Sequence, residues 1–224
     1  MTNTGNIKSF VFRSGRMSKA QKKSYETGGQ YVIPFSDKVT DFSRYFSNNN
    51  PLTVEIGFGM GKATADIAEA NAGNNYLGIE VFRAGIGKLL WEIEQRSLAN
   101  IRIVEHDAVA VIEKMIKPFS VAAFHIFFPD PWPKKRHHKR RLVQIPFAKL
   151  MVSRLSPGGY IYMVSDWENY ADEALAVLSA MPELYNPNGG SFAEGVSWRP
   201  MTKFEKKGLD KNHSIKEIYL VKRS

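Results

Sequence analysis

From about residue 52 onward, short apolar runs alternate with longer segments in which apolar residues recur every three or four positions. The short runs predict buried strands, and the longer segments predict helices with one apolar face. The predicted strands are residues 52–58, 75–81, 101–106, 121–128 and 159–166. The predicted helices are residues 62–72, 83–99, 108–116, 141–155 and 167–181. This alternation indicates an α/β protein whose parallel sheet has helices on both faces, the doubly wound arrangement.

The last apolar segment, residues 215–223, alternates in the manner of an edge strand. This pattern predicts an edge strand with one solvated face, and we expect it to be antiparallel. In open parallel sheets, ligands bind beyond the carboxyl ends of the strands. Candidate functional residues at the five predicted strand ends are Gly57, Glu80, Asp107, Asp130 and Asp166.

Positive charge is concentrated in two segments of the 224-residue chain. Residues 1–36 contain six basic side chains and one acidic, and residues 131–165 contain eight basic and none acidic, within a total net charge of +9. Like charges at this density repel unless an anion neutralises them, so nucleic acid is the leading partner and an anionic membrane surface the second. We expect a basic N-terminal arm over residues 1–36 and a single domain over residues 37–224.

Several classes of site are disfavoured by composition. Cysteine is absent, which excludes disulfides, a thiolate nucleophile and cysteine-ligated zinc, and the five histidines show no zinc-ligand spacing. We therefore expect no metal. The N-terminal segment lacks the apolar core of a signal peptide, and no run of about 18 apolar residues occurs. These features predict a cytoplasmic protein. We expect no membrane partner and no obligatory protein partner, and the sequence leaves open whether the protein is a monomer or a homodimer.

The first predicted strand carries Glu55 and leads into a turn with Gly57 and Gly59. Glycines in such a turn allow positive φ angles and a close approach of a ligand to the backbone. The spacing G-x-G-x-G differs from the G-x-G-x-x-G of dinucleotide-binding proteins, and an acidic residue here repels a pyrophosphate. A carboxylate can instead hold an ammonium or sulfonium group, which favours S-adenosylmethionine over NAD.

The next two strand ends also carry carboxylates. Glu80 ends the second predicted strand, where a carboxylate can accept hydrogen bonds from both hydroxyls of a ribose. Asp107 ends the third, where it could cap the following helix, contact an adenine ring, or do both.

The fourth strand ends in the sequence FFPDPWP, residues 127–133. Its three prolines fix φ and exclude helix, so they predict a stiff loop that presents Asp130 and Trp132. A carboxylate can accept hydrogen bonds from a base edge and an indole can stack on a base, although Trp132 could equally belong to the core. The basic segment KKRHHKRR over residues 134–141 follows at once and favours a nucleic-acid acceptor site.

At these residues, the chain resembles the bacterial tRNA (guanine-N7-)-methyltransferase family, a group of class I methyltransferases. The resemblance implies a Rossmann-like, mostly parallel, seven-stranded sheet with an antiparallel C-terminal strand. It spans nearly the whole chain, and PDPWPKKRHHKRR followed by TKFE is its most specific part. The matching segments are the N-terminal FVFRSGRMSKAQ, VEIGFGMGKAT, YLGIEV, EHDA, FFPDPWPKKRHHKRRLVQ, GGYIYMVSDWENYA and TKFEKKG.

The resemblance also implies a role for individual residues in methyl transfer from S-adenosylmethionine to guanosine 46, in the variable loop of tRNA, with S-adenosylhomocysteine as the product. Asp130 is implied as the catalytic residue, near the methyl donor. The implied cofactor contacts are Glu55, Gly57, Gly59, Glu80, Asp107 and Asp130. The implied contacts to the substrate nucleotide are Lys134, Asp166, Thr202, Lys203, Phe204 and Glu205. The implied contacts to the tRNA backbone are Arg136, His137, His138, Lys139, Arg140 and Arg141.

Three other functions remain open at the level of sequence. The first is another RNA base methyltransferase, although enzymes that methylate exocyclic amines typically carry [N/D]-P-P-aromatic where this chain has PDPW. The second is an NAD-linked oxidoreductase, and the third is a non-catalytic RNA-binding protein, for which the acidic strand ends have no use. Thr202 and Glu205 also fit a helix-capping box, Thr-x-x-Glu, without any ligand.

Overall fold

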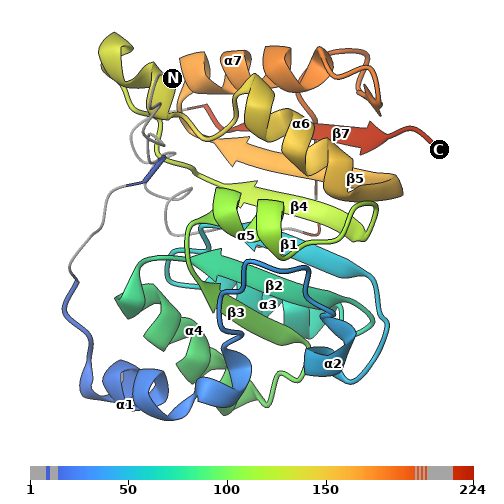
Figure 1. Ribbon diagram of the computed structural model, residues 1–224. Helices are drawn as coiled ribbons and strands as arrows, with labels where there is room; N and C mark the ends of the chain where they lie inside the picture. Colours follow the sequence, from blue (N-terminus) through green and yellow to red (C-terminus); the bar gives the residue numbers. More distant parts are fainter. Residues whose placement is uncertain (1–8, 11–14, 195, 197, 199, 201–213) are drawn as a thin grey trace, which may run out of the picture.

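A single seven-stranded sheet in the order β3-β2-β1-β4-β5-β7-β6 forms the centre of the molecule (Figure 1). The computed structural model describes residues 9–10, 15–194, 196, 198, 200 and 214–224. The strands are β1 (Leu52–Ile56), β2 (Asn75–Glu80), β3 (Ile101–Glu105), β4 (Val121–Phe127), β5 (Leu155–Ser165), β6 (Leu184–Tyr185) and β7 (Lys216–Lys222). Strands β1 to β5 pair in parallel, whereas β7 runs antiparallel to β5 and to β6. The predicted mostly parallel sheet with an antiparallel C-terminal strand is confirmed. The predicted edge position of that strand is wrong, because the short strand β6 pairs with its outer side.

Helices cover both faces of this sheet, as the strand–helix alternation predicts. Helices α5, α6 and α7 pack on one face, together with α2, and α3 and α4 pack on the other. The α-helices are α1 (Lys19–Thr27), α2 (Ser43–Phe46), α3 (Lys62–Ala70), α4 (Arg83–Arg96), α5 (Ala108–Lys114), α6 (Ile145–Arg154) and α7 (Glu168–Ser179). Two short 3-10 helices are η1 (Gly29–Tyr31) and η2 (Lys135–Arg140). Because both faces are covered, every residue of β1 is buried.

Helix α1 lies within the segment that the sequence indicated as a basic arm. It begins with a capping box, in which the Gln21 backbone N–H donates to the Ser18 side chain and the Gln21 side chain accepts from the Ser18 N–H. The helix packs along α4, and the Tyr25 hydroxyl donates to Glu105 at 2.6 Å. Further along, Ile33 is buried in the core and its N–H donates to the Ile103 carbonyl at 2.7 Å. The described residues 15–36 are therefore packed on the sheet domain.

Two predicted boundaries differ from the structure for identifiable reasons. The helix predicted from residue 83 to 99 ends at Arg96, because Ser97 adopts a left-handed conformation with φ of 53° and closes the helix. The helix predicted over 141–155 begins only at Ile145, with a proline in its first turn. Arg141, where the helix was predicted to begin, instead follows η2, a separate turn that lies outside the sheet (Figure 1).

His125 is a core residue, as its place in an apolar strand predicts. It is 2% exposed, its Nε2 lies 3.0 Å from the Tyr160 hydroxyl, and its ring stacks on Trp198. Burial lowers the pKa of His125 to about 3, so the ring is neutral at physiological pH. The ring therefore contributes packing and one hydrogen bond to the face of β4 and β5.

The close contact between α4 and the glycine turn after β1 yields a test of the fold. A Cβ atom added at Gly85 would lie 1.8 Å from the Gly59 carbonyl oxygen, so Gly85→Ala must push helix and turn apart. Overpacking of this kind costs about 1–3 kcal/mol, and we expect a melting temperature several degrees lower in scanning calorimetry. Gly73→Ala is the matched control, because a Cβ there meets nothing within 4 Å. Equal melting temperatures for the two variants would contradict this account of the packing.

Candidate active site

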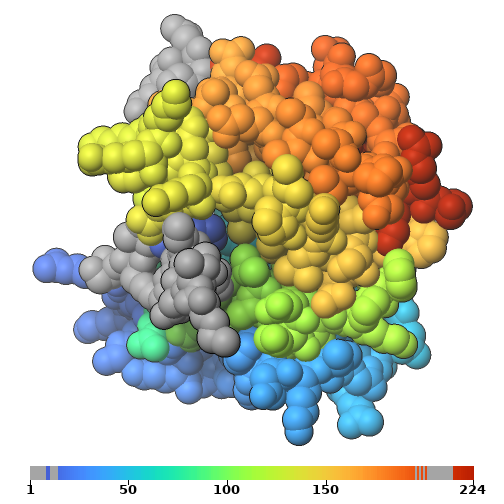
Figure 2. Space-filling model, turned by 45° about the horizontal axis from the view of Figure 1, so that its top comes forward, coloured from blue at the N-terminus to red at the C-terminus, as the bar shows by residue number. Residues whose placement is uncertain are grey.

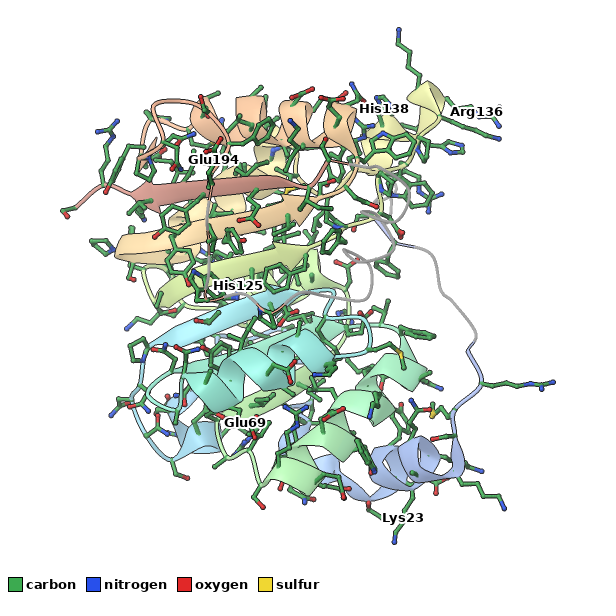
Figure 3. The ribbon with its side chains drawn as sticks, turned by 180° about the vertical axis from the view of Figure 1, so that it is seen from behind. Lys23, Glu69, His125, Arg136, His138 and Glu194 are labelled. Atoms are coloured by element: carbon green, nitrogen blue, oxygen red, sulfur yellow. The ribbon has the colours of Figure 1, made fainter. Side chains whose placement is uncertain are left out.

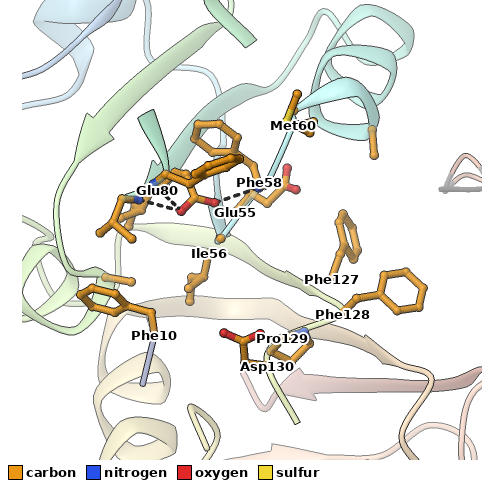
Figure 4. Close-up of a pocket in the computed structure, with 18 of the residues that line it drawn as sticks. Phe10, Glu55, Ile56, Phe58, Met60, Glu80, Phe127, Phe128, Pro129 and Asp130 are labelled. Carbon is orange, nitrogen blue, oxygen red and sulfur yellow. Dashed lines mark hydrogen bonds between the residues drawn. The ribbon is translucent and has the colours of Figure 1, made fainter. Parts of the chain in front are cut away.

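A cavity of about 580 Å³ opens at the carboxyl ends of the parallel strands (Figure 4). Its wall includes the residues that directly follow β1, β2, β3 and β4, as expected for the ligand site of an open parallel sheet. Four acidic residues take part in this wall, Glu55, Asp66, Glu80 and Asp130, and Asp66 is paired with Lys62 at 2.6 Å. Four of the residues that the sequence proposed for the cofactor therefore meet at one cavity with Asp130; they are Glu55, Gly57, Gly59 and Glu80.

The glycine turn after β1 forms one side of the cavity. Gly57 and Gly59 have φ angles of 73° and 58°, a left-handed conformation that other residues adopt only at a cost. A Cβ atom added at either position would meet no protein atom within 4 Å. The glycines are thus required for the backbone conformation, and the space beside them is open to a ligand.

The Glu80 carboxylate is held by three backbone N–H groups (Figure 4). Its Oε2 accepts from Gly59 at 2.9 Å, and its Oε1 accepts from Val81 at 2.7 Å and from Phe82 at 3.0 Å. The side chain is thereby oriented before any ligand binds, and it ties the end of β2 to the glycine turn.

Glu55 is a buried carboxyl group at the base of the cavity, with 2% of its surface exposed. Burial raises the pKa of Glu55 to about 7, and the negative charge of Glu80 adds to this shift. The Thr64 hydroxyl opposes the shift, although its oxygen forms no hydrogen bond of standard length and angle within the described residues. A cationic group bound beside Glu55 would favour its ionised form and release its proton.

Asp107 caps a helix, which is one of the two roles that the sequence left open. Its Oδ1 accepts from the Ala110 N–H at 3.1 Å at the start of α5. Its two neighbours, His106 and Ala108, line the cavity. The His106 ring stacks in parallel on the ring of Phe35, with centroids 3.7 Å apart. The cap thus fixes the loop that forms this part of the wall.

The loop after β4 carries Asp130 to the side of the cavity opposite Glu80 (Figure 4). Phe128 and Trp132, which flank the Pro129-Asp130-Pro131 segment, both have positive φ angles, of 50° and 46°. For aromatic residues this conformation is strained, and strained residues persist only where the surroundings hold them. The surrounding structure therefore holds Asp130 in place through the strained residues on either side of it.

Trp132 contacts its own protein on several sides. Its Nε1 donates to the Ser9 carbonyl at 3.1 Å, and the guanidinium carbon of Arg140 lies 3.8 Å from its ring centroid. Arg140 also donates to the Phe10 carbonyl at 3.3 Å, and Ser9 and Phe10 both line the cavity. Sequence reasoning did not place these two residues in the cavity, although an aromatic side chain among N-terminal basic residues was a signal. Trp132 thus holds described N-terminal residues over the cavity.

The basic turn η2 projects from the molecule beside this loop (Figure 2). The side chain of Arg136 points outward in Figure 3, and Lys134 and Lys139 are also exposed. Desolvation lowers the pKa of His137, and the cationic neighbours add to this effect, so the ring adds little positive charge at neutral pH. His138 is half-buried, with its Nδ1 3.4 Å from Glu173.

Arg141, the last residue of the basic segment, is buried. Only 1% of its side chain is exposed, its Nε donates to the Pro131 carbonyl at 2.9 Å, and its Nη1 pairs with Glu173 of α7. The structure thus places Arg141 beneath the surface that the sequence assigned to RNA. The change of direction comes at the end of η2, where the Arg141 N–H donates to the His138 carbonyl and closes the turn.

Two further candidates for the substrate nucleotide, Asp166 and Lys134, are not among the described residues that line the cavity. Asp166 directly follows β5, at the same edge of the sheet, and Lys134 directly precedes η2. Thr202, Lys203, Phe204 and Glu205 lie outside the described residues. Among the residues that the structure describes, no group of three or more His, Asp or Glu side chains could hold a metal ion. No helix within that described part has the length and apolar character to cross a membrane.

Comparison with known proteins agrees with this geometry. The family model described as "Putative methyltransferase" matches residues 49–218. A protein of Nitrosospira multiformis named tRNA (guanine-N(7)-)-methyltransferase is 48% identical over 97% of this chain and 95% of its own length. The chain belongs to the tRNA (guanine-N7-)-methyltransferase family.

Solved structures with much lower sequence identity share the fold of this family member. An rRNA methylase from Streptococcus thermophilus superimposes with a TM-score of 0.51 at 12% identity, over 94% of this chain and 100% of that one. A protein from Streptococcus mutans, solved in complex with SAH, superimposes with a TM-score of 0.52 at 11% identity, over 92% and 99% of the two chains. The predicted Rossmann-like methyltransferase architecture is confirmed.

The buried carboxyl of Glu55 predicts a pH-dependent cost in stability. Its pKa of about 7 in the folded protein exceeds the ordinary value of 4.5, so the folded state binds its proton more tightly. The stability associated with that proton is present below pH 4.5 and is lost as the pH rises through 7. Glu55→Gln, which resembles the protonated form, should therefore melt a few degrees above the wild type at pH 8 and close to it at pH 5. Thermal melts of the ligand-free proteins across this range measure the difference, and a pH-independent difference would contradict the assignment.

Proposed function

We propose that this protein transfers the methyl group of S-adenosylmethionine to N7 of guanosine 46, in the variable loop of tRNA. The observation that carries the proposal is the cavity at the strand ends, where carboxylates suited to a cationic cofactor lie beside a loop that presents Asp130 and a basic turn. In a chain of this family, that arrangement supports methyl transfer to a tRNA base. A cytoplasmic site of action follows from the proposed substrate.

The cofactor is held by hydrogen bonds and charge at the strand ends. Glu80, oriented by its three N–H donors, accepts hydrogen bonds from the ribose hydroxyls. Glu55 faces the ammonium of the methionine moiety, and the open backbone at Gly57 and Gly59 lets that moiety approach closely. Asp107 acts through its cap, which fixes the wall against which the adenine lies. The cofactor supplies an electrophilic methyl group on a sulfonium, which this site binds and orients.

Methyl transfer to guanine N7 does not require the protein to remove a proton from the nucleophile. N7 carries a lone pair, so the main tasks are to align it with the methyl group and to stabilise the charge that develops on the ring. The Asp130 and Asp166 carboxylates accept hydrogen bonds from the N1–H and N2–H₂ edge of guanine and offset this charge. Lys134 and the segment Thr202–Glu205 complete the nucleotide site.

The tRNA backbone binds along η2. The exposed cations of this turn, those of Arg136 and Lys139 among them, meet phosphates directly. His137 and Arg140 contact Trp132 and form the inner edge of the same surface, together with His138, which lies beside Glu173. Arg141 supports this surface from beneath.

Methyl transfer from labelled S-adenosylmethionine to unmodified tRNA, with mapping of the product base, tests the proposed function. We expect 7-methylguanosine in the variable loop, which mild alkali treatment and chain cleavage locate. Methylation of an exocyclic amine of adenine or cytosine would support a different RNA base methyltransferase. Absence of transfer to any tRNA would refute the proposal.

Asp130→Ala is the variant that tests the acceptor site. Loss of one preorganised electrostatic contact to the transition state typically lowers turnover by about 10²–10³-fold. We expect such a loss in single-turnover assays, with tRNA affinity within a few fold of the wild type because the phosphate contacts on η2 remain. Turnover close to that of the wild type would remove Asp130 from the mechanism.

Salt dependence tests the role of η2. Each phosphate contact contributes about 0.7–0.9 to the slope of log affinity against log salt concentration. The double variant Arg136→Ala/Lys139→Ala should reduce the magnitude of this slope by about 1.4–1.8 in filter-binding assays with tRNA. Lys117→Ala/Lys149→Ala, which removes two exposed lysines elsewhere, is the matched control and should leave the slope unchanged. An unchanged slope in the first variant would place the RNA surface elsewhere.

A further inference from the structure

The loop of residues 129–133 has an unusual deficit of hydrogen-bond donors. Pro129, Pro131 and Pro133 have no N–H, so this loop cannot form the backbone hydrogen bonds that stabilise an ordinary turn at these positions. The two left-handed aromatic residues, Phe128 and Trp132, add strain. At its start, the loop is anchored by the Phe128 N–H, which donates to the Val164 carbonyl at 2.8 Å. Beyond that point, side-chain donors from elsewhere in the chain must hold the loop.

Arg141 is such a donor, and it acts on the residue next to Asp130. Its Nε donates to the Pro131 carbonyl at 2.9 Å, and its Nη1 pairs with Glu173 on α7. The guanidinium also lies over the ring of Tyr170, whose hydroxyl accepts from the Val143 N–H at 3.1 Å. The loop is thereby tied to α7, the helix that follows Asp166 along the chain.

The stability of the folded protein does not by itself explain why Arg141 is buried beside Glu173. A buried arginine loses its hydration, and its Nη2 finds no hydrogen-bond partner among the described residues. An apolar side chain of similar volume often stabilises a protein at least as well as a buried ion pair. A planar guanidinium, however, can direct one donor to a carbonyl and another to a carboxylate in a fixed geometry, which a lysine cannot reproduce.

We propose that Arg141 is a positioning residue for methyl transfer, which fixes the Pro131 carbonyl, and with it Asp130, relative to α7 and Asp166. This inference rests on the proposed function and assigns Arg141 a role other than contact with the tRNA backbone. Glu173 is the partner that orients the guanidinium. Because the Arg141 N–H also closes η2 on the His138 carbonyl, the same residue links the RNA-binding turn to the acceptor loop.

Arg141→Lys tests the proposal, because it keeps the charge and loses the planar fork. We expect the single-turnover rate at saturating tRNA and cofactor to fall about 10–100-fold, since small misplacements of catalytic groups have effects of this size. The dissociation constants of tRNA and S-adenosylmethionine, and the salt slope of tRNA binding, should stay within about twofold of the wild type. Glu173→Gln, which retains an acceptor without the charge, should show a smaller loss of rate with the same affinities.

Arg154→Lys is the matched control. Arg154 also donates through Nε and Nη2 to backbone carbonyls, those of Ile112 and Glu113, but on the side of α6 away from the cavity. Arg154→Lys should lower the melting temperature, because it loses these backbone hydrogen bonds, but it should leave the single-turnover rate unchanged.

Three results would overturn the proposal. A wild-type rate for Arg141→Lys would exclude a positioning role, whether or not the protein melts earlier. Weaker tRNA binding with a smaller salt slope and an unchanged saturating rate would identify Arg141 as a backbone contact. If Arg141→Lys fails to fold, Glu173→Gln decides, and a wild-type rate for that variant refutes the proposal. Absence of transfer by the wild type itself would refute the proposed function instead, so the two failures are distinguishable.

Discussion

The Glu80 carboxylate accepts three backbone hydrogen bonds, and the site is organised around it. The bonds from Val81 and Phe82 are local, whereas the bond from Gly59 joins the end of β2 to the glycine turn after β1. That third bond is possible because β1 and β2 are parallel neighbours in register, so that both strands end at the same edge of the sheet. The same constraint brings the loop after β4 to this edge. A charged acceptor held by three donors keeps its place without a ligand, which makes the pocket preorganised.

The cavity and the exposed turn η2 differ in charge. The cavity is lined by four acidic residues and by two lysines, Lys62 and Lys88, each of which is paired with a carboxylate. Burial raises the pKa of one of the acids, Glu55, to about 7. The cations of η2 lie outside and face solvent. This arrangement suits the two proposed ligands, which are a cationic cofactor in the cavity and tRNA phosphates at the surface. The net charge of +9 describes neither region.

Neighbouring residues of the basic segment have different surroundings. Arg140 lies over the Trp132 ring and donates to the Phe10 carbonyl, whereas Arg141 turns inward to Pro131 and Glu173. The proline-rich loop supplies few donors of its own, and Arg141 compensates by donating to the Pro131 carbonyl, whereas Arg140 packs on the Trp132 ring. Rigidity at this loop is therefore imposed from outside, by residues that a sequence motif presents as one uniform basic run.

The spacing of apolar residues determined the alternation of strands and helices and the parallel sheet, because a strand buried on both faces is a continuous apolar run. The acidic residues at the ends of these runs determined that carboxylates lie at one edge of the sheet. The docking of α1, the inward turn of Arg141 and the raised pKa of Glu55 were decided only by tertiary structure. Each of these depends on contacts between residues far apart in the chain, such as Arg141 with Glu173. Side-chain direction and desolvation are set by that packing, and local sequence does not encode them.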